Sequence, residues 1–196
     1  MKKMKLSQFA VIQSGLVLNR REAHHIEETE KVYNRINLRS LNEYGKIDHK
    51  ELDSFPADSI INEVFLTQPN DIIVKLFAPI CPTLITEADK GLVIPSQVAV
   101  IRINNDLVLP EYLCYYLSLS NVSDLMLSIE GWRSQRTIKI GTFTQLEIPI
   151  PPIDKQKLIA KIVKTNLKIN QLYSELIEQE NKLANLKIQN FIGGKL

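Results

Sequence analysis

The residues best suited to chemistry lie in a short basic segment, residues 130–139. There Arg133, Ser134, Gln135 and Arg136 are consecutive, with a tryptophan before them and a threonine and a lysine after them. Arginine can hold guanine and glutamine can hold adenine through paired hydrogen bonds in the major groove, while serine, threonine and lysine suit phosphates. The segment therefore indicates nucleic-acid recognition. The alternative interpretation is a solvated loop around a buried tryptophan.

Five other polar residues are candidates for contacting DNA. Two lie at the ends of predicted neighbouring strands and three lie in the polar stretch 20–39; they are Lys75, Gln97, Arg20, Arg21 and Arg35. The charge distribution constrains how they can act, because the first 39 residues carry eight lysines and arginines against four acids, whereas residues 40–130 carry five against thirteen. The basic groups must converge on one face, with the acidic middle of the chain pointing away from the phosphates.

The sequence contains none of the motifs that usually carry catalysis. It has no glycine-rich phosphate loop, no nucleophile elbow, no adenine-methyltransferase motif and no nuclease carboxylate set. The prolines at 151 and 152 follow an isoleucine, whereas the methyltransferase motif needs a polar side chain there. Cys81 and Cys114 fit neither a disulfide framework nor a metal motif, so we expect reduced cysteines. The prediction is a binding module without a catalytic centre, cofactor or metal of its own.

The first part of the chain, residues 1–152, is predicted to form one α/β (α+β) domain. Residues 5–17 predict a short helix or a strand with a turn, and β-branched runs predict strands at 32–38, 72–77, 92–94 and 97–103. A helix is predicted from Leu109, with Tyr112 and Tyr116 on its core face, and a second helix near residues 123–129 ends at Gly131.

The sequence also bears on cellular location. No apolar run approaches the roughly 20 residues that a membrane span needs, and no signal-peptide core follows Met1. We therefore expect a soluble, cytoplasmic protein that does not engage a membrane.

Residues 153–196 predict one long amphipathic helix. Asp154 is a good N-cap, and Ile153 with Leu158 suits a hydrophobic staple. Beyond the cap, alternating spacings of four and three follow the a and d rhythm of a coiled-coil seam, at Leu158, Ile162, Thr165, Ile169, Leu172, Leu176, Gln179, Leu183, Leu186 and Asn190.

This seam is narrow and partly polar. A helix packed on its own domain usually has a broader apolar face, so pairing with another chain is favoured over folding back. Thr165, Gln179 and Asn190 weaken such a seam but specify register, which indicates one defined partner.

Several motifs, in order, resemble the specificity (S) subunits of type I restriction-modification systems. Ser14-Gly15 lies near the start, and residues 70–73, Asn-Asp-Ile-Ile, are similar to the family's Gly-Asp-Ile-Leu. Residues 95–102 are followed by residues 109–117, Leu-Pro-Glu-Tyr-Leu-Cys-Tyr-Tyr-Leu. The most distinctive motif is Ile-Pro-Ile-Pro-Pro-Ile-Asp-Lys-Gln at residues 148–156, which leads directly into the long helix.

The resemblance implies a non-catalytic subunit in which a target-recognition domain reads a few base pairs and a helix spaces it from a second such domain. It implies partner M subunits that methylate adenine with S-adenosylmethionine, and R subunits that use ATP and Mg²⁺. This sequence departs from the family because one domain and one helix replace the usual two of each. The resemblance therefore predicts a homodimer through the C-terminal helix, reading an interrupted palindrome in double-stranded DNA.

Two other classes of function remain open. A coiled-coil adaptor whose domain binds protein rather than DNA would suit the acidic middle of the chain. A nuclease or methyltransferase acting alone ranks third.

Overall fold

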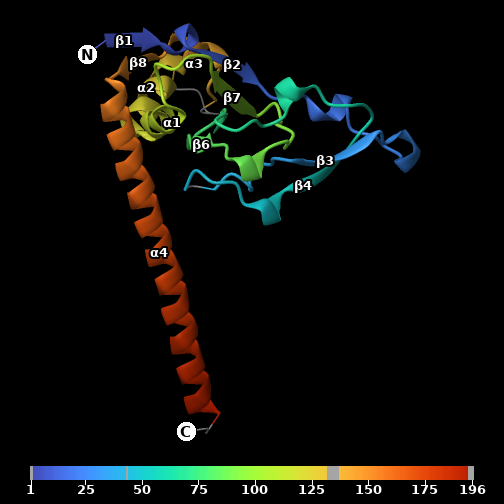
Figure 1. The fold of residues 1–196 in the computed structure, drawn as a ribbon. Coiled ribbons are helices and arrows are strands. Elements are labelled where there is room, and N and C mark those ends of the chain that lie inside the picture. The colour runs from blue at the N-terminus through green and yellow to red at the C-terminus, as the bar shows by residue number, and fades with distance from the viewer. Residues whose placement is uncertain (1, 43, 132–136, 194–196) are drawn as a thin grey trace. The chain divides into compact units, whose positions relative to one another are not determined.

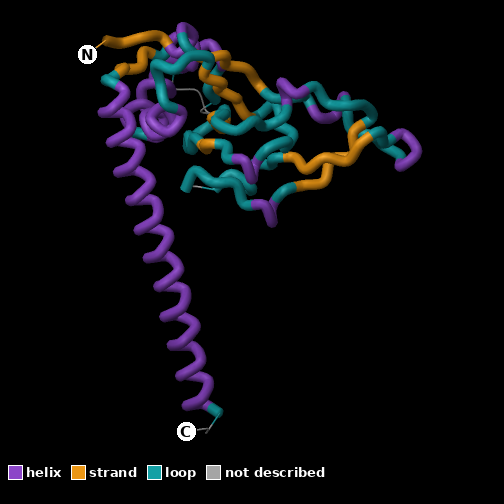
Figure 2. The backbone as a smooth tube through the Cα atoms, viewed as in Figure 1, coloured by secondary structure: helices purple, strands orange, loops and turns teal. Residues whose placement is uncertain are grey.

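The structure of the chain is a computed structural model that describes residues 2–42, 44–131 and 137–193. It comprises two compact units, Met1–Lys157 and Leu158–Leu196. Figures 1 and 2 show the elements of the first unit and the long helix that continues into the second. The strands of the described residues are β1 (Lys2–Lys5), β2 (Ala10–Ser14), β3 (Lys31–Arg35), β4 (Asp53–Ala57), β5 (Ile72–Lys75), β6 (Thr83–Leu84), β7 (Val98–Ile103) and β8 (Glu147–Ile150). The α-helices are α1 (Pro110–Ser118), α2 (Ser120–Glu130), α3 (Ile140–Gln145) and α4 (Ile153–Ile192).

A four-stranded antiparallel sheet, in the order β2-β7-β5-β6, forms the centre of the first unit. Strand β7 pairs with a neighbour on each side, and its first four residues are buried. Its β-branched sequence suits this position, because such side chains pack well on a pleated surface. Ile36, Ile73 and Ile94 join Val98 and Val100 in a fully or almost fully buried cluster beside the sheet. The strand predicted at residues 97–103 is thus confirmed.

Two further pairs of strands complete the sheets of this unit: β1 with β8, and β3 with β4, both antiparallel. The β3–β4 hairpin packs Tyr33 and Phe55 into a second core cluster. The pairing of β1 with β8 was not predicted, since β1 reads Lys-Lys-Met-Lys and β8 contains Pro149. Proline is tolerated there because β8 has a single neighbour and is an edge strand.

Gly15 lies where two segments of backbone cross. Its N–H donates to the carbonyl oxygen of Val98 at 3.0 Å, and the next residue, Leu16, donates to Ile94 at 2.7 Å. A Cβ atom at Gly15 would stand 2.2 Å from the Ile94 carbonyl oxygen and 2.4 Å from that of Pro95. No side chain fits in this space, which accounts for glycine in the Ser14-Gly15 motif.

The predicted helices in the domain are confirmed with small shifts in their ends. Helix α1 has Pro110 in its first turn and buries Tyr112, whereas Tyr116 is only partly buried. Helix α2 ends at Glu130, and Gly131 follows with φ +75°, a left-handed conformation that favours glycine.

Three local predictions were wrong. Helix α4 begins at Ile153, so Asp154 lies inside the first turn and is not the N-cap. The Pro152 carbonyl instead accepts hydrogen bonds from the N–H groups of Lys155 and Gln156, which shifts the cap and removes the predicted staple. The segment 92–94 is not a regular strand, although its middle residue, Val93, is buried and forms isolated bridges.

Candidate nucleic-acid interface

Glu130, the first residue of the segment 130–139, contacts residues at and just beyond the end of that segment. The Glu130 carboxylate accepts hydrogen bonds from the backbone N–H of Lys139, at 2.9 Å, and from the hydroxyl of Thr142. The Lys139 ammonium lies 3.6 Å from the same carboxylate. The Thr142 hydroxyl and the Lys139 N–H favour the ionised form, so they hold the pKa of Glu130 below its usual value. Both ends of the segment are therefore fixed to one carboxylate.

The last described part of this segment, residues 137–139, contacts the residues that follow strand β5. The Ile138 N–H donates to the Leu76 carbonyl oxygen at 2.9 Å, and Thr137 forms an antiparallel bridge with Phe77. Ile138 is buried, with 1% of its surface exposed. The four predicted base-reading residues, Arg133, Ser134, Gln135 and Arg136, lie outside the described residues together with Trp132. Their role stays a prediction.

Lys75 and Gln97 lie beside one another at the same end of the central sheet. Lys75 pairs with Val98 in the register of β5 and β7, and the N–H of Leu76 donates to the Gln97 carbonyl oxygen at 2.9 Å. The same Leu76 binds Ile138, so three segments far apart in the sequence meet at this sheet end. Gln97 is exposed, whereas Lys75 is half-buried and donates from Nζ to the Leu41 carbonyl oxygen at 2.9 Å.

The three other arginine candidates lie near strands β3 and β4: Arg20 and Arg21 in a turn before β3, with Arg21 beside residues 58 and 59, and Arg35 in β3 opposite Asp53. Arg20 and Arg21 are exposed, and Arg21 donates to the Ser59 hydroxyl at 3.1 Å. Arg35 is half-buried, with carboxylate oxygens of Asp53 at 3.4 Å and of Glu22 at 3.9 Å. A phosphate would have to compete with these two carboxylates for Arg35. Arg20 and Arg21 are therefore better suited to contact DNA.

The motif residues Asp71 and Arg102 form an ion pair that the sequence did not predict. The Asp71 side chain is buried and that of Arg102 is 20% exposed. Arg102 Nε donates to Asp71 Oδ1 at 2.9 Å, and a terminal nitrogen donates to Oδ2 at 3.1 Å. The remaining guanidinium donors reach the carbonyl oxygens of Val64 and Leu66, and the N–H of Gln68 also binds the carboxylate. Burial raises the pKa of Asp71, against the opposing effect of the Arg102 hydrogen bonds. This fork joins the start of β5 to the C-terminal half of β7, at the end of the sheet opposite Lys75 and Gln97.

The first turn of α4 is held by a second buried polar residue, Gln156. Its side-chain oxygen accepts from the Leu109 N–H at 2.8 Å, and its amide nitrogen donates to the carbonyl oxygens of Leu107 and Pro151 at 2.8 and 2.9 Å. Gln156 is 0% exposed. Gln156 ends the motif at residues 148–156, but its place between two lysines in a helix did not predict that its side chain is buried.

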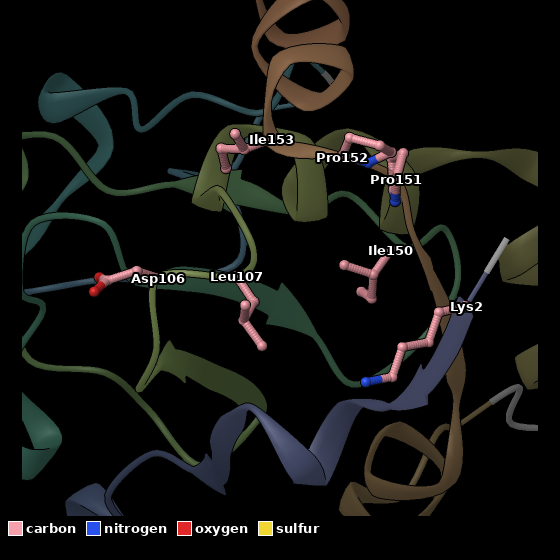
Figure 3. A pocket seen from close by; sticks show the side chains of 7 residues that line it. All are labelled: Lys2, Asp106, Leu107, Ile150, Pro151, Pro152 and Ile153. Carbon is pink, nitrogen blue, oxygen red and sulfur yellow. The ribbon is translucent and has the colours of Figure 1, made fainter.

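An open hollow of about 620 Å³ lies beside this turn (Figure 3). Five of its seven lining residues are apolar, and Lys2 and Asp106 are the charged ones; the apolar residues are Leu107, Ile150, Pro151, Pro152 and Ile153. The lining has no nucleophile paired with a base, so it is not an active-site arrangement.

Other reactive groups of the described residues are similarly unsuited to catalysis. Across residues 2–42, 44–131 and 137–193, no group of three or more His, Cys, Asp or Glu could hold a metal ion. Burial, with a smaller effect from the Glu111 charge, raises the pKa of the Cys114 thiol to about 12, so little thiolate forms near neutral pH. Among the described helices, none is both long and apolar enough to cross a membrane.

A family model described as the type I restriction modification DNA specificity domain matches residues 1–181. The chain belongs to this family. Residues 1–181 are thus a DNA specificity domain of the type I restriction-modification family. A search of curated protein sequences finds no match.

Solved structures of S subunits share this fold. The HsdS subunit from Thermoanaerobacter tengcongensis superposes with a TM-score of 0.68 at 16% identity, covering 96% of this chain and 47% of that one. A chain from a structural study of complex assembly and conformational transition of the type I R-M system gives 0.65 at 15% identity, covering 100% and 46%. The S subunit from M. genitalium gives 0.56 at 19% identity, covering 96% and 45%. The chain thus spans about half the length of the S subunits it matches.

Proposed function

We propose that this chain reads one half of a bipartite DNA site, using the end of the central sheet where Lys75, Gln97 and the segment 130–139 meet. The observation that supports the proposal is that Leu76 is hydrogen-bonded both to Gln97 and to Ile138, which follows the predicted base-reading residues closely in the sequence. A recognition segment with both ends fixed loses less conformational entropy on binding than a free one. In this proposal Arg20 and Arg21, which precede strand β3 in the chain, contact phosphates.

The proposed partners follow from the family. An M subunit supplies adenine methylation with S-adenosylmethionine, and an R subunit supplies ATP- and Mg²⁺-dependent restriction. This chain places those subunits on DNA and holds none of their cofactors. In this proposal residues 1–152 form the recognition domain, and residues 153–196, which include α4, serve as spacer and dimerisation element.

A second copy of the chain supplies the other half-site in this proposal. The observation that supports it is the seam of α4, which is exposed along its length. Seven large apolar residues of that seam are each 42–58% exposed: Leu158, Ile162, Ile169, Leu172, Leu176, Leu183 and Leu186. A seam of this kind is covered by another helix of the same rhythm.

The target sequence is identified first, by methylome sequencing of cells that express this chain with its M subunit. Binding of the purified chain to a duplex of that sequence is then measured as a function of salt. We expect Arg133→Ala and Arg136→Ala to weaken binding about tenfold or more if the arginines read bases. Arg20→Ala is expected to weaken binding to all duplexes equally and to lower the salt slope by about one.

Lys90→Ala is the matched control, since Lys90 is exposed and lies outside both groups of candidates. It should leave affinity and salt slope nearly unchanged. Affinity that does not respond to salt or to either arginine substitution would overturn the proposal and favour a protein-binding adaptor.

A further inference from the structure

The rod, residues 158–192 of α4, is one unbroken helix (Figure 2). In the sequence, charged residues border its seam on both sides. In heptad terms Ile169, Leu176 and Leu183 occupy position a, and Leu172 and Leu186 occupy position d. The residues of all five positions are exposed, so nothing within the rod covers them. What covers them must match both the seam and its bordering charges.

Those charges form two borders. Glu175 and Lys182 lie on the g border, while Glu180 and Lys187 lie on the e border. Lys182 also forms an i, i+4 ion pair with Glu178 of its own helix, at 2.5 Å. In coiled coils the g and e residues of one helix face those of the partner and decide orientation and partner choice.

A parallel pair of these rods, in register, would place like charges together. In that arrangement each g residue faces the e residue of the following heptad on the other helix. Glu175 would face Glu180 of the second copy, and Lys182 would face Lys187. Each repulsion would occur twice because the pair is symmetric.

An antiparallel pair behaves differently, because g then faces g. When Leu172 lies opposite Leu183 of the second copy, Glu175 lies opposite Lys182, and the reciprocal contact repeats it. In this register two of the three polar seam residues match, since Thr165 lies opposite Asn190, while Gln179 lies opposite Leu176. The two Gln179 side chains lie on either side of the two-fold axis, where each can bond the other chain.

Antiparallel registers shifted by one heptad lose the contacts between Glu175 and Lys182. Sliding the second rod by one heptad in one direction brings Glu175 opposite Glu175 and Lys168 opposite Lys182. Sliding it in the other direction brings Lys182 opposite Lys182. The first register alone among these three has two opposite-charge contacts and no like-charge contact on the g border.

We propose that a second copy of this chain covers the seam in this one antiparallel register, and that Glu175 and Lys182 are the residues that select it. This rests on the proposed homodimer and specifies its partner, orientation and pairing. The two-fold axis then crosses the middle of the rods, and each domain is joined to the N-terminal end of its own rod. Two identical domains related in this way read inverted half-sites, not direct repeats.

The test uses charge reversals in the full chain, with the dimer dissociation constant measured by sedimentation equilibrium. Lys182→Glu and Glu175→Lys should each weaken the homodimer about tenfold, since two attractive contacts become repulsive. An equimolar mixture of the two variants should recover wild-type affinity, because every 175–182 contact in the mixed pair joins opposite charges. Lys164→Glu is the control: it makes the same charge change away from both borders and should leave affinity nearly unchanged.

Each outcome separates the alternatives. In the parallel arrangement both single reversals would strengthen pairing, because each replaces a like-charge contact by an opposite-charge one; that result overturns the proposed register and keeps the homodimer. Single reversals without effect, or a mixture that does not recover, also overturn it. A wild-type chain that stays monomeric at micromolar concentration removes the homodimer itself, which is a failure of the proposed function.

Discussion

Gln156 offers a sharp test of how the first turn of α4 is attached to the domain. Three hydrogen bonds join its side chain to backbone groups of Leu107, Leu109 and Pro151, and the residue is fully buried. The perturbations are Gln156→Leu, which keeps the volume and removes all three bonds, and Gln156→Glu, which keeps the acceptor and replaces the donor.

The expected loss in free energy of unfolding depends on how deeply each hydrogen bond is buried. The bonds to Leu107 and Leu109 are partly buried, so losing each costs about 1 kcal/mol, whereas the buried Pro151 carbonyl, left unpaired, costs about 2 kcal/mol. The apolar side chain of leucine offsets about 1 kcal/mol of this sum. We therefore expect Gln156→Leu to lower the free energy of unfolding by about 3 kcal/mol, a large fraction of the stability of a typical domain.

Gln156→Glu should lower the free energy of unfolding further at pH 7, because the introduced carboxylate faces two carbonyl oxygens without water. Burial and these oxygens raise the folded-state pKa of that carboxyl above its unfolded value of about 4.3. The folded protein then binds the proton more tightly, so stability is greatest below about pH 4.3 and falls as pH rises through the folded pKa. The deficit of Gln156→Leu should not depend on pH.

Urea unfolding of both variants at pH 7 and pH 5 measures these free energies. Asn181→Leu and Asn181→Asp, at an exposed position of the same helix away from the seam and its borders, are the controls and should stay within about 0.5 kcal/mol of wild type. The reasoning is refuted if both Gln156 variants are as stable as the controls, or if Gln156→Glu becomes less stable as the pH is lowered from 7 to 5.

Three further predictions concern the domain. Arg102→Met should lower the free energy of unfolding by about 3–5 kcal/mol in urea titrations, because it leaves the Asp71 carboxylate buried without its partner, and adding Asp71→Leu should recover most of the loss. Gly15→Ala should cost about 1–3 kcal/mol, since its Cβ would meet backbone oxygens, whereas Gly141→Ala, with open space at the Cβ, should be neutral or stabilising. Glu130→Gln should lower the melting temperature at pH 7 but not in acid: the depressed pKa of Glu130 stabilises the fold above about pH 4.5, and this contribution disappears as pH falls through the folded pKa.

The long helix and the central strands could be predicted because their signals are local and repeated. Ten seam positions at spacings of four and three identify α4, and the β-branched run from Val98 to Ile103 identifies a central strand. The β1–β8 pair could not be predicted in this way. Its strands are rich in lysine and proline, and they form because the chain ends of the domain meet, which is a tertiary effect that overrides local propensity.

The candidate interface was predictable in part. Two strands that are neighbours in the sheet brought Lys75 and Gln97 together, as their positions at strand ends predicted. The pairing of Ile138 with Leu76 was not predicted, because it joins segments far apart in the sequence through irregular backbone. Glu130 belongs to the segment predicted to bind DNA, but a glutamate before a glycine does not by itself predict that its carboxylate binds the N–H of Lys139.

Four of the motif residues make contacts that hold the scaffold together. Gly15 allows a backbone crossing, Asp71 and Arg102 form a buried fork, and Gln156 fixes the first turn of α4. Each is constrained by packing or by hydrogen bonds to backbone groups, so substitution there carries a large cost in stability. An exposed residue such as Gln97 carries no such constraint, and surface substitutions change stability little. In the proposed arrangement, such a fold acquires a new DNA target by changing exposed side chains at the proposed interface, while the motif residues and the proposed pairing rod stay the same.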